Sequence, residues 1–417
     1  MAKTLTPLDA NVIINQIAQE ATGQDSSLTT VASSDFVSVG ETALRTGMEN
    51  TLNALGMVMG RLISASRAYE GKLKIIDASD EGRFTQRRRK ISYYAQDAEA
   101  SGDWNTQLLT NLGLGLDNTD NGGTSAPSMW VQKPGMPVEV DFYSHNTWQD
   151  RLTFYPEQLK IAFRDQAEFT KLINGIVTEN GNNITQQIEA HRRLTLLNYL
   201  GGLYDCNQNV QAIDLVAAYN TKYNISPALT RGDLLSPTYF KSFLEFFVST
   251  VKQLSNYMEY RSVKNHWTMT KTVGGVNYDI LRHTPKDRQK LIMYRPFWID
   301  AETMIMPEIF NDEYLQVDNF EAVDFWQNID FGAAIDVTPA VPDILGGTGL
   351  QIAGNNVALD YVVGVLFDED ACVDSNIFDD SLTSPLEAAK RYYNQIWHFN
   401  HGSINDFTEK GILLYMG

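Results

Sequence analysis

The spacing in this chain that comes nearest to a metal-binding pair is His398 and His401, in the stretch "RYYNQIWHFNHG". On a helix, imidazoles three residues apart share a face and can bind one transition-metal ion. This stretch has the pattern of a strand and a turn, and no acidic triad stands near the pair. We therefore expect no metal here. We also expect His191, beside Arg192, to be a partly buried helical residue rather than a general base.

Neither the glycines nor the carboxylates have the spacing of a known ligand site. Gly347, Gly349 and Gly354, in "LGGTGLQIAG", fit neither the dinucleotide-binding pattern nor a phosphate-binding P-loop, and they predict a loop. The acidic residues 368–370 do not match the calcium-loop spacing and predict a solvated acidic loop. Nucleophile-elbow and zinc-protease motifs are absent. The sequence thus predicts no catalytic residue, no cofactor and no metal, although paired carboxylates of a glycosidase need no sequence proximity.

Four consecutive cations, Arg87, Arg88, Arg89 and Lys90 in "FTQRRRKISYY", stand out in a chain with a formal net charge of −18. An acidic surface repels a phosphate backbone, so tight non-specific nucleic-acid binding is not expected. Complementary charge instead favours carboxylates of this acidic protein as partners of the run. A solvated basic turn and a local DNA contact are the alternatives.

Composition indicates a globular protein of two or three domains, with 417 residues of which 43% are hydrophobic. Cys206 and Cys372 lack any CxxC spacing, which argues against a disulfide framework and a zinc ribbon. The N-terminal residues lack the apolar core of a secretory signal. The uncharged stretch "NTLNALGMVMG" is too short to span a bilayer, which takes roughly 20 apolar residues. We therefore expect synthesis in the cytoplasm and no membrane partner.

The hydrophobic pattern predicts an α+β chain. Residues 1–40 are polar and predict an extended arm, and helically spaced apolar residues follow up to Gly71. Residues 72–140 have strand-like ends around "LDNTDNGGTSAPS", which predicts a long hairpin with a loose middle. Such a hairpin is marginal alone and must lie on another surface.

Three strong helices are predicted in the middle of the chain. The first has Pro156 at its first position, and "TENGNN" separates it from the second, which Gly201-Gly202 ends. The third begins at Ser236-Pro237. Strands are predicted at "VNYDIL", "KLIMYRPFWI", "ALDYVVGVLFD", "RYYNQIWHFNHG" and "KGILLYM".

This order of elements resembles the major capsid proteins of tailed bacteriophages, which have the Hong Kong 97-type fold, and among them the short-tailed phages with small genomes. "YPEQLKIAFRDQAEFTKLINGIVTENGNNITQQIEAHRRLTLLNYL" is similar to their spine-helix region. "HTPKDRQKLIMYRPFWIDAETMIMPEIFNDEYLQVDNFEAVDFWQN" is similar to a segment of the axial domain near the capsomer centre. "RYYNQIWHFNHGSINDFTEKGILLYM" is similar to the closing strands of the peripheral domain.

The resemblance implies the following division of the chain: an N-terminal arm (1–40), a helix leading into the peripheral domain (41–71), an extended β-hairpin loop (72–140), a peripheral domain with spine helices (141–230), an axial domain (231–388) and C-terminal strands that return to the peripheral domain (389–417). The loop over 72–140 would lie across an adjacent subunit, which gives the basic run its expected place.

The resemblance also implies a structural protein of the virion rather than an enzyme. Copies would form hexamers and pentamers that tile an icosahedral or prolate shell around the double-stranded DNA, which lies against the inner face without sequence-specific binding. Scaffolding, portal and decoration proteins would be further partners. Two alternatives stay open: a carbohydrate-active or carbohydrate-binding protein, suggested by the many aromatic and carboxylate side chains, and another phage structural protein of the head decoration or tail.

Overall fold

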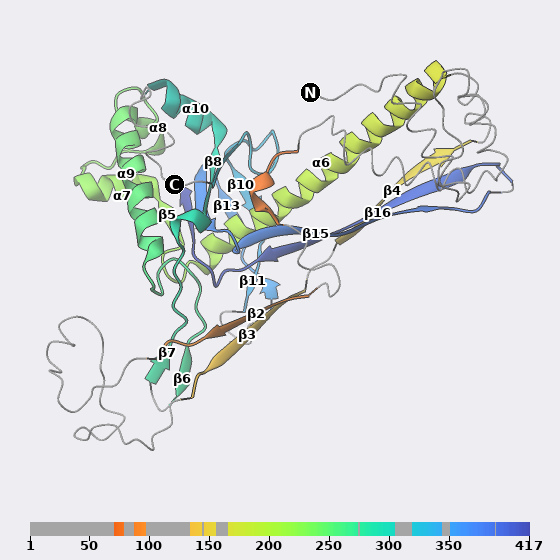
Figure 1. Cartoon of the computed structure of the whole chain (residues 1–417). Helices are drawn as coiled ribbons and strands as arrows, with labels where there is room; N and C mark the ends of the chain where they lie inside the picture. The colour runs from red at the N-terminus through yellow and green to blue at the C-terminus, as the bar shows by residue number, and fades with distance from the viewer. Residues whose placement is uncertain are drawn as a thin grey trace. The chain divides into compact units, whose positions relative to one another are not determined.

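A computed structural model describes residues 71–78, 87–96, 134–143, 146–155, 166–273, 276–304, 319–343, 351–387 and 389–417 (Figure 1). The expected arm, nearly all of the helix expected over 41–71, and Pro156 lie outside these residues. The chain divides into two compact units. Unit 1 comprises residues 1–86, 144–193 and 374–403, and unit 2 comprises residues 87–143, 194–373 and 404–417.

Unit 1 contains a four-stranded sheet in the order β1-β15-β16-β4. Its strands are β1 (Asp77–Ala78), β15 (Cys372–Thr383), β16 (Tyr393–Asn405) and β4 (Asn146–Phe154). The short 3₁₀ helix η2 (Lys74–Ile76) precedes β1. Strand β1 pairs parallel with β15, and β16 pairs antiparallel with β4 from Tyr393↔Phe154 to His401↔Asn146. Along β16, buried and half-buried residues alternate up to Phe399, as a strand with one buried face requires.

The long helix α6 (Gln166–Cys206) corrects two sequence expectations. The two helices predicted on either side of "TENGNN" are one continuous helix, in which the Thr185 hydroxyl donates a hydrogen bond to the Gly181 carbonyl. A glycine weakens a helix by only about 1 kcal/mol, so packing of the flanking turns carries the helix through this stretch. Four further residues of helix follow Gly202, and the helix ends at Cys206.

Gly201 and Gly202 serve close packing inside unit 2 instead of ending the helix. A Cβ atom at Gly202 would overlap the Phe407 ring, and one at Gly201 would lie 2.8 Å from Val337 Cγ1. Only a residue without a side chain lets the helix approach these neighbours so closely. The sequence signal for a helix end was therefore a packing signal.

Unit 2 is built on a five-stranded sheet in the order β5-β17-β14-β8-β9. Its strands are β5 (Ala212–Asp214), β17 (Gly411–Tyr415), β14 (Val362–Asp368), β8 (Gln289–Tyr294) and β9 (Asn319–Val323). The central strand β14 pairs antiparallel with both β17 and β8, and all seven of its residues are buried. A strand covered on both faces needs a continuous apolar run, which "VVGVLF" provides.

Helices pack against this sheet and form the main core of unit 2. They are α7 (Leu215–Tyr223), α8 (Arg231–Leu234), α9 (Phe240–Glu259) and α10 (Arg295–Met304). Phe243 and Phe247 of α9 are fully buried in one cluster with Leu291 and Leu366 of the sheet. The period of the apolar residues in α9 predicts this buried stripe correctly.

Two element boundaries in unit 2 differ from the sequence expectation. "KLIMYRPFWI" is not a single strand, because β8 ends at Tyr294 and α10 begins at Arg295. Proline is tolerated in the first helical turn, and Phe297 in α10 stacks edge-on against Phe247, so packing on α9 favours the helix. Helix α9 begins at Phe240 rather than at Ser236, although the Phe240 amide does donate to the Ser236 carbonyl.

Four two-stranded ribbons complete the described strands of unit 2. They are β2 (Arg87–Tyr93) with β3 (Pro137–Tyr143), β6 (Lys271–Val273) with β7 (Val276–Tyr278), β10 (Ile335–Val337) with β13 (Val357–Leu359), and β11 (Ala340–Pro342) with β12 (Gln351–Ala353). A short 3₁₀ helix, η4 (Lys286–Arg288), precedes β8. The antiparallel pairing of β2 and β3 is the one that the sequence predicts. Within the described part of the chain, no helix is both long enough and apolar enough to span a membrane.

Candidate functional site

The basic run lies on strand β2, so successive side chains point to opposite faces of the β2–β3 ribbon. Arg89, Ile91 and Tyr93 are exposed, whereas Lys90 is half-buried and Ser92 is buried. Arg87 and Arg88 belong to the strand, but their side chains lie outside the described residues. The ribbon therefore has an inward face at Lys90 and Ser92 and an outward face at Arg89, Ile91 and Tyr93.

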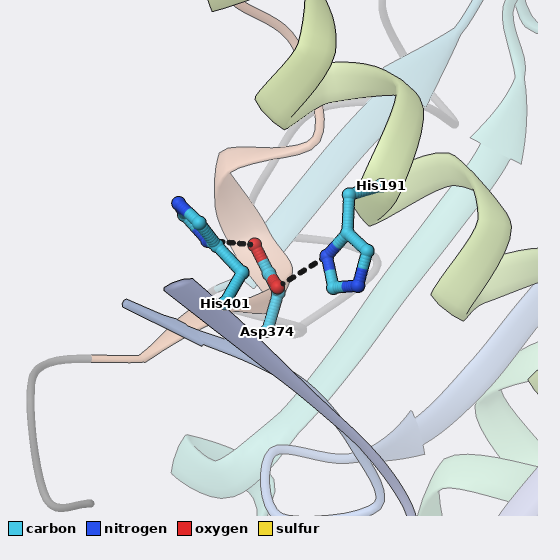
Figure 2. Close-up of side chains that lie close together, drawn as sticks. All are labelled: His191, Asp374 and His401. Carbon is cyan, nitrogen blue, oxygen red and sulfur yellow. Dashed lines mark hydrogen bonds and ion pairs between the residues drawn. The ribbon is translucent and has the colours of Figure 1, made fainter. Parts of the chain in front are cut away.

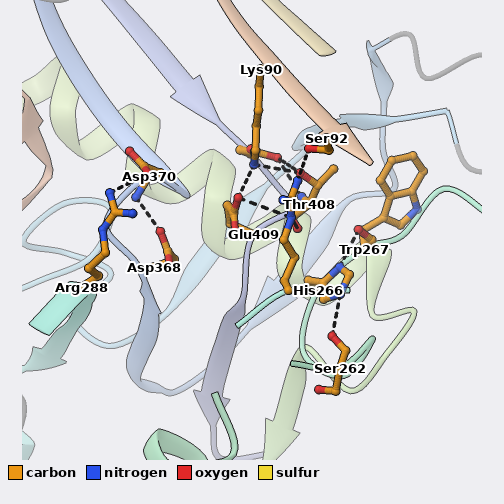
Figure 3. Close-up of polar contacts among 12 residues, drawn as sticks. Lys90, Ser92, Ser262, His266, Trp267, Arg288, Asp368, Asp370, Thr408 and Glu409 are labelled. Carbon is orange, nitrogen blue, oxygen red and sulfur yellow. Dashed lines mark hydrogen bonds and ion pairs between the residues drawn. The ribbon is translucent and has the colours of Figure 1, made fainter. Parts of the chain in front are cut away.

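The inward face is bound to the turn between β16 and β17 of the same chain (Figure 3). The Lys90 ammonium forms ion pairs with Asp406 and Glu409, and it donates a hydrogen bond of 3.2 Å to the Thr408 hydroxyl. The Thr408 amide and hydroxyl donate to Asp406 Oδ1 at 2.9 and 2.6 Å, which fixes the turn that presents both carboxylates. Lys90 thus has partners within its own chain that sequence reasoning did not foresee.

Arg282 joins the same group and connects the turn to Ser92. Its Nη2 donates to Ser92 Oγ at 2.6 Å, and its Nε lies 3.5 Å from Glu409 Oε1. With Lys90 and Asp406, this makes two cations and two carboxylates in one network, so the formal charges balance. We call Lys90, Arg282, Asp406 and Glu409 the clasp. A balanced and largely buried network of this kind fixes geometry more than it adds stability.

The carboxylates of the clasp have shifted pKa values of opposite sign. Burial alone would raise the pKa of Asp406, but the Lys90 charge and the hydrogen bonds from Lys90 and Thr408 outweigh burial and lower it. Burial raises the pKa of Glu409, and the attraction of Lys90 only partly offsets that effect. Asp406 is therefore the firmly ionised partner of Lys90, and Glu409 is the one that takes up a proton more readily.

The outward face carries both charge and exposed apolar surface. Arg89 Nε lies 2.5 Å from Glu139 Oε1 and 3.4 Å from Asp141 Oδ1 on the neighbouring strand. Ile91 is 57% exposed and Tyr93 is 62% exposed, although a strand this short gains little by presenting such residues to water. The contact with a neighbouring copy stays a prediction. The outward face is the part of the ribbon available for that contact, since Ile91 and Tyr93 are exposed there whereas Lys90 is half-buried against its own chain.

A second cluster of chemistry-bearing side chains is buried in unit 1. His191 of α6, Asp374 of β15 and His401 of β16 lie together, and Figure 2 shows the carboxylate between the two imidazoles. His191 Nδ1 is 2.8 Å from Asp374 Oδ1, and His401 Nδ1 is 3.4 Å from Oδ2. Each of these three side chains is at most 2% exposed. Sequence reasoning paired His401 with His398 instead.

His398 and His401 lie on strand β16, as the sequence pattern predicts, and residues three apart on a strand face opposite ways. His401 is buried, whereas His398 is only half-buried. His191 is fully inside and not partly buried as expected. No local sequence pattern could have joined these groups, because His191 and Asp374 are 183 positions apart.

The Asp374 carboxylate stays ionised although it is buried. Burial would raise its pKa, but the hydrogen bond with His191 and the nearby His401 imidazole outweigh burial and bring the pKa far below its usual range. Arg192 adds a further contact, with Nε 3.2 Å from Asp374 Oδ2, and its Nη2 forms an ion pair with Asp77. Trp148 of β4 stands edge-on to His191 at 4.8 Å and covers the cluster.

The acidic candidates and the two cysteines have structural roles in unit 2, whereas Gly347 and Gly349 lie outside the described residues. The acidic residues expected to be solvated are in fact paired, since Arg288 binds Glu369 at 2.5 Å and Asp370 at 3.0 Å. Asp368 is buried and accepts from the Asp370 amide. Both cysteines are buried free thiols.

Comparison with known proteins rests on structure alone, because no protein-family profile and no curated protein matches the chain. The capsid structure of Staphylococcus phage Andhra matches with a TM-score of 0.50 at 10% identity, over 84% of this chain and 85% of that chain. This chain has the Hong Kong 97-type capsid fold. The expected fold class, α+β of the Hong Kong 97 type, is thereby confirmed.

Two further structures show a weaker likeness to this capsid fold. A chain from the structure of the head fibre and inner core protein of bacteriophage P68 matches with a TM-score of 0.48 at 10% identity, over 84% of this chain and 85% of that chain. The capsid of cyanophage P-SCSP1u matches with a TM-score of 0.41 at 8% identity, over 84% of this chain and 88% of that chain. The domain boundaries given above for the capsid fold stay predictions.

Proposed function

We propose that this chain is the major capsid protein of a tailed bacteriophage, a structural protein whose copies assemble into the head shell. The observation that carries the proposal is the match to a phage capsid structure over 84% of the chain. In this role the protein is a component of the virion, is made in the host bacterial cytoplasm and needs no catalytic centre.

Within the shell, copies form hexamers and pentamers, and the closed surface surrounds the double-stranded DNA. The formal net charge of −18 supports a shell that does not bind the packaged DNA tightly, because carboxylates repel phosphates. Scaffolding, portal and decoration proteins are the further partners expected of such a shell.

The two faces of the β2–β3 ribbon have different roles in assembly: one binds the same subunit and the other contacts a neighbouring copy. The clasp holds the inward face to its own subunit, so the ribbon presents a fixed outward face. Arg89, Ile91 and Tyr93 on that face contact an adjacent copy, where the apolar side chains supply contact area and Arg89, with Glu139 and Asp141, supplies polar partners.

The test is to purify the full chain after expression in bacteria and to examine it by negative-stain electron microscopy and analytical ultracentrifugation. Shells, rings or tubes built from many copies are the expected result. A chain that stays monomeric at high concentration and has glycosidase activity would overturn the proposal.

A further inference from the structure

The buried cluster of His191, Asp374 and His401 has the composition of a transition-metal site. One ligand atom from each residue lies within 4.8 Å of the other two, and all three residues are buried. Two imidazoles and one carboxylate are a ligand set that suits Zn²⁺ and related ions, whereas Mg²⁺ and Ca²⁺ prefer oxygen ligands throughout.

His401 provides the second observation, because its polar atoms are not satisfied by the protein. Neither Nδ1 nor Nε2 has a hydrogen-bond partner among the described residues, although the side chain is only 2% exposed. A buried polar atom without a partner is uncommon in native proteins and often indicates a missing water or ion. His401 Nδ1 lies 3.4 Å from Asp374 Oδ2, at a poor angle for a hydrogen bond.

The distance of 3.4 Å between His401 Nδ1 and Asp374 Oδ2 fits two atoms that bind the same metal ion. Ligands about 2.0–2.1 Å from a tetrahedral zinc ion stand about 3.4 Å from each other. The widest separation in the cluster is under 4.8 Å, so closing the ligands on one ion takes shifts of roughly 1 Å. Rotation of the imidazoles supplies such shifts.

The surrounding charges permit a cation. Arg192 touches Asp374, but it also forms an ion pair with Asp77, so its charge is matched by a second carboxylate. With both imidazoles neutral, Asp77, Asp374 and Arg192 sum to a formal charge of −1. Arg192 then acts as the outer partner that orients a ligating carboxylate, as such partners do in established metal sites.

We propose that His191, Asp374 and His401 bind one transition-metal ion, with Zn²⁺ as the best-suited species. The ion ties helix α6 to strands β15 and β16 within unit 1. Its role is structural, since the ligands are buried and Trp148 covers the cluster at 4.8 and 5.7 Å from the two imidazole rings.

The experiment uses the full chain, stripped of metal with a chelator and titrated at pH 7.5 with Zn²⁺, and separately with Mg²⁺, by isothermal calorimetry. Co²⁺ replaces Zn²⁺ in a parallel sample, because its visible absorption reports a low-symmetry site with nitrogen ligands. We expect one Zn²⁺ per chain, no Mg²⁺ binding, and a Co²⁺ absorption spectrum that indicates nitrogen ligands.

The variant His401→Ala should lower Zn²⁺ affinity at least about 100-fold, since loss of an outer partner alone lowers it 10–100-fold. His398→Ala is the matched control on the same strand and should bind like the parent. His401→Gln, which keeps more of the side-chain volume, replaces His401→Ala if circular dichroism shows that the alanine variant does not fold. A parent chain that binds no Zn²⁺, or equal binding by the His401 and His398 variants, would overturn the proposal.

Discussion

At the scale of single residues, Lys410 is unusual because its charged side chain is fully buried. Its ammonium donates to the carbonyls of Tyr257 and Tyr260 and to the Ser262 hydroxyl. These carbonyls lie at the C-terminal end of α9, where a cation is favoured by the helix dipole. No carboxylate is among these three partners, so burial lowers the pKa of Lys410 to about 8.

The shift predicts how stability depends on pH. The unfolded chain holds the Lys410 proton up to a pH of about 10.4, whereas the folded chain releases it near 8. Between these values the unfolded state binds more protons, so this residue makes the free energy of unfolding rise with pH. Urea unfolding at pH 7.5, 8.5 and 9.5 should show a more positive pH slope in the parent than in a Lys410→Met variant, because the raised pKa of Cys206 contributes a slope of opposite sign equally to both chains. A Lys410→Met variant with the same pH slope as the parent would contradict it.

The two thiols give a second prediction at this scale. Cys372 is fully buried and out of reach of a reagent, and burial raises the pKa of Cys206 to about 12, so Cys206 does not form the reactive thiolate at neutral pH. A chromogenic disulfide reagent at pH 8 should label neither thiol in the folded chain, and both in guanidinium chloride. Rapid labelling of one thiol without denaturant would show that its surroundings open readily.

At the scale of elements, the clasp and the outward face of β2 separate two roles that the sequence could not distinguish. Replacing Lys90 with Glu places a third carboxylate beside Asp406 and Glu409, and losing one partner of a buried ion pair costs about 3–5 kcal/mol. Arg89→Glu changes an exposed residue, so it should alter stability by less than about 1 kcal/mol but reduce assembly. Urea unfolding and sedimentation measure the two effects separately.

Each variant is the control for the other, because the residues are adjacent on opposite faces of one strand. If Lys90→Glu unfolds at the same urea concentration as the parent, the clasp does not hold the ribbon. If Arg89→Glu assembles like the parent at low salt, the outward face does not contact a neighbouring copy.

The glycines of α6 allow a test of close packing. Gly202→Ala should lower stability by about 1–3 kcal/mol, because the added methyl group overlaps the Phe407 ring. Gly232→Ala in α8 is the comparison, since its Cβ would meet only Thr230 Oγ1 at 3.8 Å, and helix propensity favours alanine. A Gly202 variant as stable as the parent would mean that Phe407 moves aside freely.

Local periodicity explains which elements were predictable. The alternation in β16 and the apolar stripe of α9 each follow from one buried face, and both elements were predicted. The joining of two expected helices into α6 was not, because the glycine at 181 is a weak local signal that packing overrides. The boundary at Arg295 was also missed. The apolar run continues across it, so the sequence pattern does not mark the place where the backbone changes from strand to helix.

Sites assembled from distant segments were beyond sequence reasoning. The basic run was visible, but its partners Asp406 and Glu409 lie more than 300 positions away, so the clasp could not be foreseen. The cluster around Asp374 likewise draws on three elements, and only its histidines stood out by residue type. A chain of this length offers too many charged residues to choose such partners without a fold.

At the scale of the whole molecule, assembly should bury a large surface. The β2–β3 ribbon exposes apolar side chains on its outward face, and a shell subunit meets several neighbours at once. We therefore expect the contact area for each subunit to exceed a standard interface of about 1,600 Å² by a wide margin. Coordinates of an assembled particle would test this, and residues 72–140 folded back on their own subunit without any neighbour contact would contradict it.

The position of β17 in the unit 2 sheet has a consequence for synthesis on the ribosome. This strand fills the space between β5 and β14, yet it is made after every other strand of that sheet. Until residues 411–415 emerge, β14 has an unpaired apolar edge, which is prone to aggregation. A ribosome that stops before residue 411 therefore releases a chain without a finished sheet. We expect such a fragment to be degraded by proteases before it can join an assembly.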